Sequence, residues 1–247
     1  MLKNTLNSIS PLDGRYATKL RDLEQHFSEY ALIKNRVLVE INWLIFMSRT
    51  KSLRFIPALS KNKETSLLKI INEFSVKDAE QIKKIEAKTN HDVKAVEIFI
   101  GKKLESLNLK KYKEFVHLFC TSEDINNLSY NLMLKGYLDN EFKEINSLLL
   151  KDLKSKSKKW SKLSMLSFTH GQTASPTTLG KEIANFHERV KYHLNLLKFL
   201  NPSGKFNGAV GNYNAHVITD DKVNWQSLSE KFVKSLGLNW SKYSTQI

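Results

Sequence analysis

Three short polar segments of the chain hold side chains that can bind anions and exchange protons. They are Asn90–Asp92, Thr121–Asp124 with Asn126 and Asn127, and Thr169–Gln172 leading to Ser175–Thr178. Each is expected at or near the start of a helix, where unpaired backbone N–H groups and the positive end of the helix dipole favour carboxylates and phosphates. Taken singly, each segment also fits a simpler interpretation, a polar helix cap followed by a solvated turn.

Two histidines, His91 and His170, lie within these polar segments. Histidine exchanges protons near neutral pH, so both are candidates for general acid or base chemistry. His117 and Cys120 are three residues apart and could contact a metal ion from one face of a helix. The sequence offers no second ligand pair at a diagnostic spacing, so a packed helix with a buried thiol is the favoured interpretation.

A fourth segment, Ser10–Tyr16, combines turn-forming residues with an arginine and a tyrosine before the first expected long helix. Arg15 is one of only six arginines among the 39 basic residues, which singles it out for a specific role. The net charge of +14 is an excess of lysine spread along the chain. Arginine is the side chain suited to bidentate phosphate and guanine contacts. Because arginines are few and the excess charge is lysine, we expect no nucleic-acid partner. The dense group Lys151–Lys162 is interpreted as a solvated helix end.

The elements that position these segments are expected to be helices, because apolar residues recur at three- and four-residue steps. Apolar stripes cover residues 20–45, 67–74, 82–85, 125–153 and 178–200. Ser75 with Asp78 and Thr121 with Asp124 have the spacing of capping boxes, which predicts helix starts at both places. Long amphipathic helices need partners to bury their stripes, which favours a bundle or an assembly of subunits.

We therefore predict an all-α fold with two domains. An N-terminal helical domain covers residues 1–110, and residues 111–247 form the first long helices of a central bundle, with Lys103–Lys113 as the candidate boundary. A glycine cluster at Gly204, Gly208 and Gly211 lacks both the spacing and the preceding strand of a dinucleotide-binding motif. We interpret it as a tight connection between two helices.

Composition limits the class of protein further. The 247 residues are 41% hydrophobic and 26% charged, which excludes collagen-like, low-complexity and disordered chains. The single cysteine cannot form an internal disulfide, and Met1–Ser10 does not resemble a secretory leader, so we expect a cytoplasmic protein. No apolar run approaches the roughly 20 residues that cross a bilayer, so no membrane partner is expected.

Taken together, five segments closely resemble adenylosuccinate lyase in its bacterial form, within the fumarase and aspartase superfamily. They are Ser10–Tyr16, Thr89–Glu97, Cys120–Leu128, Thr169–Gln172 and Asn207–Asn214. The resemblance extends over the whole chain and implies a fumarase/aspartase-type helical bundle. It also implies elimination of fumarate from adenylosuccinate and from the succinyl-carboxamide intermediate earlier in purine synthesis, with no cofactor and no metal.

The resemblance assigns roles to individual residues. His170 would be the general acid that protonates the leaving nitrogen. The implied substrate-binding residues are Arg15, Tyr16, Asn90, His91, Asp92, Thr121, Ser122 and Gln246. The first two would hold the nucleotide phosphate, and Thr121 and Ser122 would donate to the succinyl carboxylate. The partner is then a small-molecule nucleotide.

Family members continue beyond the position of Ile247 with further helices and a loop, Ser-Ser-x-Met-Pro-x-Lys-x-Asn, whose serine is the catalytic base. That motif does not occur in this sequence. Since an acid and a base that act as a unit lose most of the rate when one is missing, full activity is expected to need that further part. The resemblance implies a homotetramer at full length, and the alternative for this chain is a non-catalytic remnant or an assembly fragment.

Overall fold

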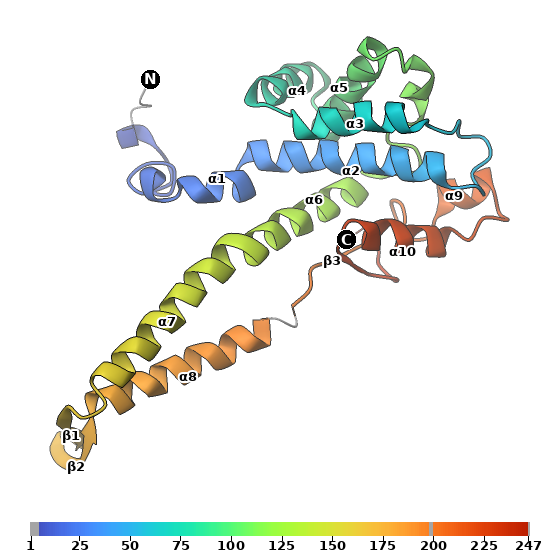
Figure 1. Ribbon diagram of the computed structural model, residues 1–247. Coiled ribbons are helices and arrows are strands. Elements are labelled where there is room, and N and C mark those ends of the chain that lie inside the picture. Colours follow the sequence, from blue (N-terminus) through green and yellow to red (C-terminus); the bar gives the residue numbers. More distant parts are fainter. Residues whose placement is uncertain (1–4, 198–199, 247) are drawn as a thin grey trace. The chain divides into compact units, whose positions relative to one another are not determined.

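The computed structural model describes residues 5–197 and 200–246, and helices dominate it (Figure 1). The chain forms two compact units. The first contains the residues up to Gly136 and those from Pro202 onward, and the second extends from Tyr137 to Asn201. The predicted predominance of helices is confirmed. The predicted boundary between residues 110 and 111 lies inside the first unit, and the two-domain division stays a prediction.

The first unit contains mostly α-helices with short 3₁₀ turns. Its helices are η1 (Thr5–Asn7), η2 (Ala17–Lys19), α1 (Arg21–Phe27), α2 (Glu29–Arg49), α3 (Lys61–Asn72), α4 (Val76–Thr89), α5 (Asp92–Ser106), η3 (Lys110–Phe115), α6 (Ser122–Tyr137, ending at the unit boundary), α9 (Asn214–Thr219) and α10 (Trp225–Ser235). Two short strands, β3 (Ser203–Gly204) and β4 (Asn239–Trp240), pair in parallel.

Helix α2 is the central element of the first unit, and more than half of its residues are buried. Its Trp43 packs against Phe206 and Phe232, with ring centroids 4.5 and 4.9 Å away. These contacts attach the residues after Pro202 to the N-terminal helices. Ser28 separates α1 from α2, because its hydroxyl caps α2 by accepting the Ala31 N–H at 3.1 Å. The apolar stripe predicted over residues 20–45 therefore belongs to two helices.

A helix starts at both predicted capping boxes, and at the second one, among the described residues, only the Asp124 side chain makes its contact. The Asp78 carboxylate accepts the Ser75 backbone N–H at 3.0 Å where α4 begins. In the same way, Asp124 accepts the Thr121 N–H at 3.0 Å where α6 begins. The local sequence alone is sufficient for these starts, since both partners lie within one turn.

The second unit contains a helical pair and a β-hairpin (Figure 1). Its elements are η4 (Leu138–Phe142, a π-helical turn), α7 (Lys143–Lys159), β1 (Ser164–Thr169), β2 (Gln172–Thr178) and α8 (Leu179–Leu197). Helices α7 and α8 approach closely at Gly180, where a Cβ atom would collide with the Ser157 carbonyl oxygen. Residues 198 and 199 of the helix predicted over 178–200 lie outside the described residues. The hairpin was not expected from a sequence interpreted as almost entirely helical.

Much apolar surface of the second unit is uncovered. No residue of α7 is buried, and Leu148 and Phe186 are 58% and 57% exposed. Lys151–Lys162 lies at the end of α7 and beyond it, and its lysines are exposed, as predicted. None of the described helices combines the length and the apolar character needed to cross a membrane.

Candidate functional site

A buried arginine on α2 joins two of the polar segments identified in the sequence. Arg36, whose side chain is 6% exposed, donates to Asp92 Oδ2 at 2.6 Å and to Asn126 Oδ1 at 2.9 Å. Burial alone would raise the pKa of Asp92, but the Val93 N–H and the Arg36 guanidinium hold this pKa below its usual value. The Arg36 side chain therefore links Asp92, at the start of α5, to Asn126 of α6.

His91 and Asn90 occupy the connection between α4 and α5. Asn90 ends α4 in the left-handed conformation, with φ of 52°, and His91 caps α5. The His91 Nδ1 accepts the Lys94 backbone N–H at 3.1 Å, so the neutral ring carries its proton on Nε2. The His91 side chain is 51% exposed, which leaves Nε2 accessible as a hydrogen-bond donor.

Thr121 and Ser122 stand at the first turn of α6, as predicted. Over the part of the chain that the structure describes, neither hydroxyl makes a hydrogen bond to protein, and both residues are half-buried. Two free hydroxyls beside the positive end of a 16-residue helix form an arrangement that suits a carboxylate.

Asp124 connects this helix start to the glycine-rich segment. Its fully buried carboxylate accepts the backbone N–H groups of Asn207 and Gly208, each at 3.1 Å. It also lies 3.0 Å from Lys205 Nζ, in a side chain that is 4% exposed. The glycine-rich segment, predicted only as a tight connection between helices, is therefore also held against the first turn of α6 through residues 205–208.

The segment that carries Gln246 meets the same place. Asn207 Nδ2 donates to Ser244 Oγ at 2.9 Å. Gly211, with φ of 80°, packs so closely that a Cβ atom there would collide with the Ser244 carbonyl oxygen. Gln246 follows two residues later and is exposed. The structure thus brings together Asn90–Asp92, Thr121–Asn127, Lys205–Gly211 and the residues around Ser244.

The loop that precedes Thr121 is held by a buried glutamate. His117 and Phe119 have positive φ angles of 61° and 69°, a conformation that is costly for residues other than glycine. The Glu40 carboxylate accepts the His117 backbone N–H at 3.1 Å and lies 2.5 Å from His117 Nδ1. Trp43 Nε1 donates to the Leu118 carbonyl at 2.9 Å. Helix α2 therefore holds this loop through Glu40 and Trp43, in addition to contacting α5 and α6 through Arg36.

This geometry corrects the expectation for His117 and Cys120. Both lie in a non-helical loop after η3, not on one face of a packed helix. Burial alone would lower the pKa of His117, but Glu40 raises this pKa above the ordinary histidine value. Among the described residues, no cluster of three or more His, Cys, Asp or Glu side chains could hold a metal ion.

Arg15 and Tyr16 lie in a separate, exposed turn of the first unit. The turn is closed by backbone hydrogen bonds such as Tyr16 N–H to the Pro11 carbonyl at 2.9 Å. The Arg15 guanidinium lies 5.5 Å from the centre of the Tyr16 ring. In residues 5–197 and 200–246, neither side chain makes a hydrogen bond, so the structure does not join this turn to the Arg36 and Asp124 contacts.

His170 belongs to the second unit, at the tip of the β1–β2 hairpin. His170 and Gly171 have φ angles of 50° and 71°, and Thr169 pairs with Gln172 across them. Two successive positive φ angles are typical of a tight two-residue hairpin turn. The expectation that His170 lies near a helix start is therefore wrong, since α8 begins only at Leu179. Its side chain is exposed.

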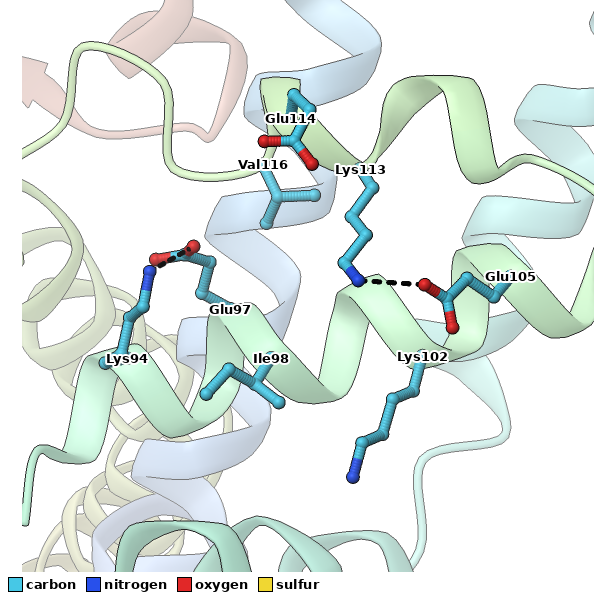
Figure 2. A pocket seen from close by; sticks show the side chains of 8 residues that line it. All are labelled: Lys94, Glu97, Ile98, Lys102, Glu105, Lys113, Glu114 and Val116. Carbon is cyan, nitrogen blue, oxygen red and sulfur yellow. Dashed lines mark hydrogen bonds and ion pairs between the residues drawn. The ribbon is translucent and has the colours of Figure 1, made fainter. Parts of the chain in front are cut away.

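A cavity of about 330 Å³ between α5 and η3 contains none of the predicted site residues. Figure 2 shows its lining, in which Lys94 pairs with Glu97 at 2.6 Å and Lys113 with Glu105 at 2.8 Å. Most of the charge in this pocket is already neutralised by these neighbours. The arrangement around Thr121 and Ser122, with its unpaired donors, is the stronger candidate for anion binding.

Sequence reasoning missed two side chains that build the site, Arg36 and Glu40. Both are buried charges one turn apart on α2, among its buried apolar residues. Buried charges need partners, so an arginine and a glutamate inside a long apolar stripe are the signal that could have identified them.

The chain matches the lyase family over residues 14–247. It is 43% identical over 245 residues to adenylosuccinate lyase of Buchnera aphidicola subsp. Schizaphis graminum, and 44% identical over 248 residues to that of Haemophilus influenzae. These alignments cover 99% and 100% of this chain, but 54% of each relative. The chain therefore spans about half the length of the curated relatives it matches.

Two solved structures share the fold. Fumarate lyase from a Mesorhizobium species matches with a TM-score of 0.72 at 16% identity, covering 92% of this chain and 49% of that one. A β-carboxy-cis,cis-muconate cycloisomerase from Acinetobacter calcoaceticus matches with a TM-score of 0.67 at 19% identity, covering 92% of this chain and 51% of that one. At such identities the likeness concerns the arrangement of helices.

Proposed function

We propose that this chain, which belongs to the lyase family, is the N-terminal part of an enzyme that eliminates fumarate from adenylosuccinate to give AMP. The same chemistry would release fumarate from the succinyl-aminoimidazole-carboxamide ribotide to give AICAR. The observation that carries the proposal is the convergence of the Asn90, Thr121 and Ser244 segments around Arg36 and Asp124. We infer the substrate from the names of the relatives that are about 43% identical to this chain.

The reaction breaks a C–N bond after a base takes a proton from the carbon beside a carboxylate. The family resemblance assigns this base to the serine of the loop motif that this sequence does not contain. The electron pair from that C–H bond passes through a carboxylate-stabilised dianion and expels the nitrogen, which must be protonated as it departs. In the proposal, the Thr121 and Ser122 hydroxyls donate to the succinyl carboxylate at the positive end of α6. These donors stabilise the charge that develops at this end of the substrate.

We assign the protonation of the leaving nitrogen to His170. The exposed imidazole at the hairpin tip can exchange protons with solvent, which suits a general acid that must be reloaded at each turnover. The remaining roles follow the sequence assignment: Arg15 and Tyr16 hold the phosphate, and Asn90, His91, Asp92 and Gln246 line the substrate. His91 would act as a donor through Nε2, given that Nδ1 is occupied by Lys94.

The uncovered apolar residues of α7 and α8 support the proposal of a homotetramer in which other copies cover this surface. Helical bundles bury such stripes against neighbouring helices. The division into an N-terminal domain and a central bundle, and a place in the cytoplasm, belong to the same proposal.

A turnover assay tests the function. The chain, together with whatever sequence follows Ile247 in its gene, should convert adenylosuccinate to equal amounts of AMP and fumarate. Replacing His170→Gln should lower kcat by orders of magnitude. No fumarate from the parent protein would contradict the function, and near-normal turnover in the variant would contradict only the role of His170.

The alternative proposal for this chain, which spans 54% of each relative, is a non-catalytic remnant or an assembly fragment. Calorimetric titration of the 247-residue chain with AMP separates the two. Saturable binding supports a preserved nucleotide site, whereas no measurable heat supports the remnant.

A further inference from the structure

We propose that Asn207 and Ser244 are positioning residues that hold Gln246 in place relative to Thr121. The inference deepens the proposed function and rests on it, because Gln246 is there assigned to contact the substrate. It follows from a continuous chain of hydrogen bonds between the first turn of α6 and the segment that carries Gln246.

The first link is the Asp124 carboxylate. It accepts the Thr121 N–H on one side and the Asn207 N–H on the other, at 3.0 and 3.1 Å. Because this carboxylate is fully buried and paired with Lys205, its contacts are not weakened by solvent. The backbone of Asn207 is therefore fixed relative to the first turn of α6.

The second link is the side chain of Asn207. This residue is fully buried, and its Nδ2 donates to Ser244 Oγ at 2.9 Å. The same hydroxyl lies 3.1 Å from Asn207 Oδ1 and 3.1 Å from the Thr245 carbonyl oxygen. Both ends of the Asn207 amide thus contact one serine, which specifies where the backbone passes.

Gly211 restricts the same point from another side. It has no side chain, so its backbone lies directly against the Ser244 carbonyl group. Ser244 is therefore held both by a hydrogen-bonded side chain and by a close backbone contact.

Gln246 itself has no such support. In the described chain its exposed side chain makes no hydrogen bond to protein. The position of its amide therefore depends on the backbone that carries it. Loss of the Ser244 hydroxyl should let this segment move and should weaken substrate binding without removing any group that contacts the substrate.

Steady-state kinetics on the chain with its following sequence test the inference. Ser244→Ala should raise KM for adenylosuccinate by about three- to tenfold, the effect of losing one hydrogen bond, and leave kcat within about twofold. Ser244→Thr keeps the hydroxyl and should restore KM. Ser235→Ala is the matched control, since its hydroxyl donates to the Phe232 carbonyl at the end of α10, and it should leave KM unchanged.

A double-mutant cycle shows whether Ser244 acts through Gln246. If it does, the double variant has the KM of Gln246→Ala alone. Effects of the two substitutions that multiply would overturn the positioning inference while leaving the proposed function intact. An unchanged KM in Gln246→Ala would overturn both the assigned role of Gln246 and the inference.

Nitrogen-15 relaxation gives a readout that does not depend on turnover. The order parameter of the Gln246 backbone amide should fall in Ser244→Ala and remain at the parent value in Ser235→Ala. Equal order parameters in the parent protein and Ser244→Ala would overturn the inference even in a protein without measurable activity.

Discussion

His216 on α9 is a buried histidine whose environment makes the stability of the protein depend on pH. Its side chain is 1% exposed and lies among three aromatic rings, with centroid distances of 5.0 Å to Phe119, 5.0 Å to Trp225 and 5.3 Å to Tyr213. Neither ring nitrogen has a hydrogen-bond partner among the described residues. Desolvation by burial lowers the pKa of His216 to about 4.

The sign and size of the effect follow from proton binding. The unfolded chain binds a proton at this histidine below a pKa of about 6.5, whereas the folded protein does so only below about 4. Stability is therefore lost as the pH falls through this window, by about 3 kcal/mol in total for a shift of about 2.5 units at about 1.4 kcal/mol each. Between pH 7 and pH 5 the loss is about 2 kcal/mol.

Replacing His216→Phe keeps an aromatic ring of similar size and removes the titrating group. Urea denaturation at pH 7 and pH 5 should show a loss of stability on acidification that is about 2 kcal/mol smaller in this variant than in the parent protein. The exposed His193 provides the matched control, and His193→Phe should keep the parent's pH dependence. An identical loss in the parent protein and His216→Phe would refute the reasoning.

Three further results are expected. Arg36→Met should lower the free energy of unfolding by about 2 kcal/mol, because it removes the hydrogen bonds to Asp92 and Asn126. A loss below about 0.5 kcal/mol in thermal denaturation would contradict this. Gly211→Ala should lower the free energy of unfolding by clearly more than Gly171→Ala does. Both glycines have positive φ, but only Gly211 packs against backbone atoms. Equal losses of unfolding free energy in urea denaturation would contradict the close contact. The pKa of His117, measured by NMR titration, should lie above 6.5 in the parent protein and should fall in Glu40→Gln. The stability that the His117–Glu40 pair contributes is present below pH 6.5 and is lost as the pH rises through the folded-state pKa of His117.

The helices could be predicted because their signals are local. Capping residues three apart, as in Ser75 and Asp78, and apolar steps of three and four define an element without knowledge of the rest of the chain. The β1–β2 hairpin could not be predicted in this way. Its strands are mostly exposed, and its turn depends on positive φ at His170 as well as at Gly171.

The candidate site was predictable only in part. Polar segments such as Asn90–Asp92 and Thr121–Asp124 were recognisable from composition and from the family resemblance. Arg36 and Glu40 were not, because their partners lie 56 and 77 residues away in the sequence. The burial of His216 likewise depends on rings from separate segments, which no local pattern encodes.

The central claim is that the first turn of α6 and the residues held against it bind a succinyl-bearing nucleotide. Amide NMR spectra of the protein titrated with adenylosuccinate test it most directly. We expect the largest shift changes at Thr121, Ser122 and His91, with little change at Lys113 in the cavity of Figure 2. Saturable changes centred on Lys113, with none at Thr121 and Ser122, would contradict it.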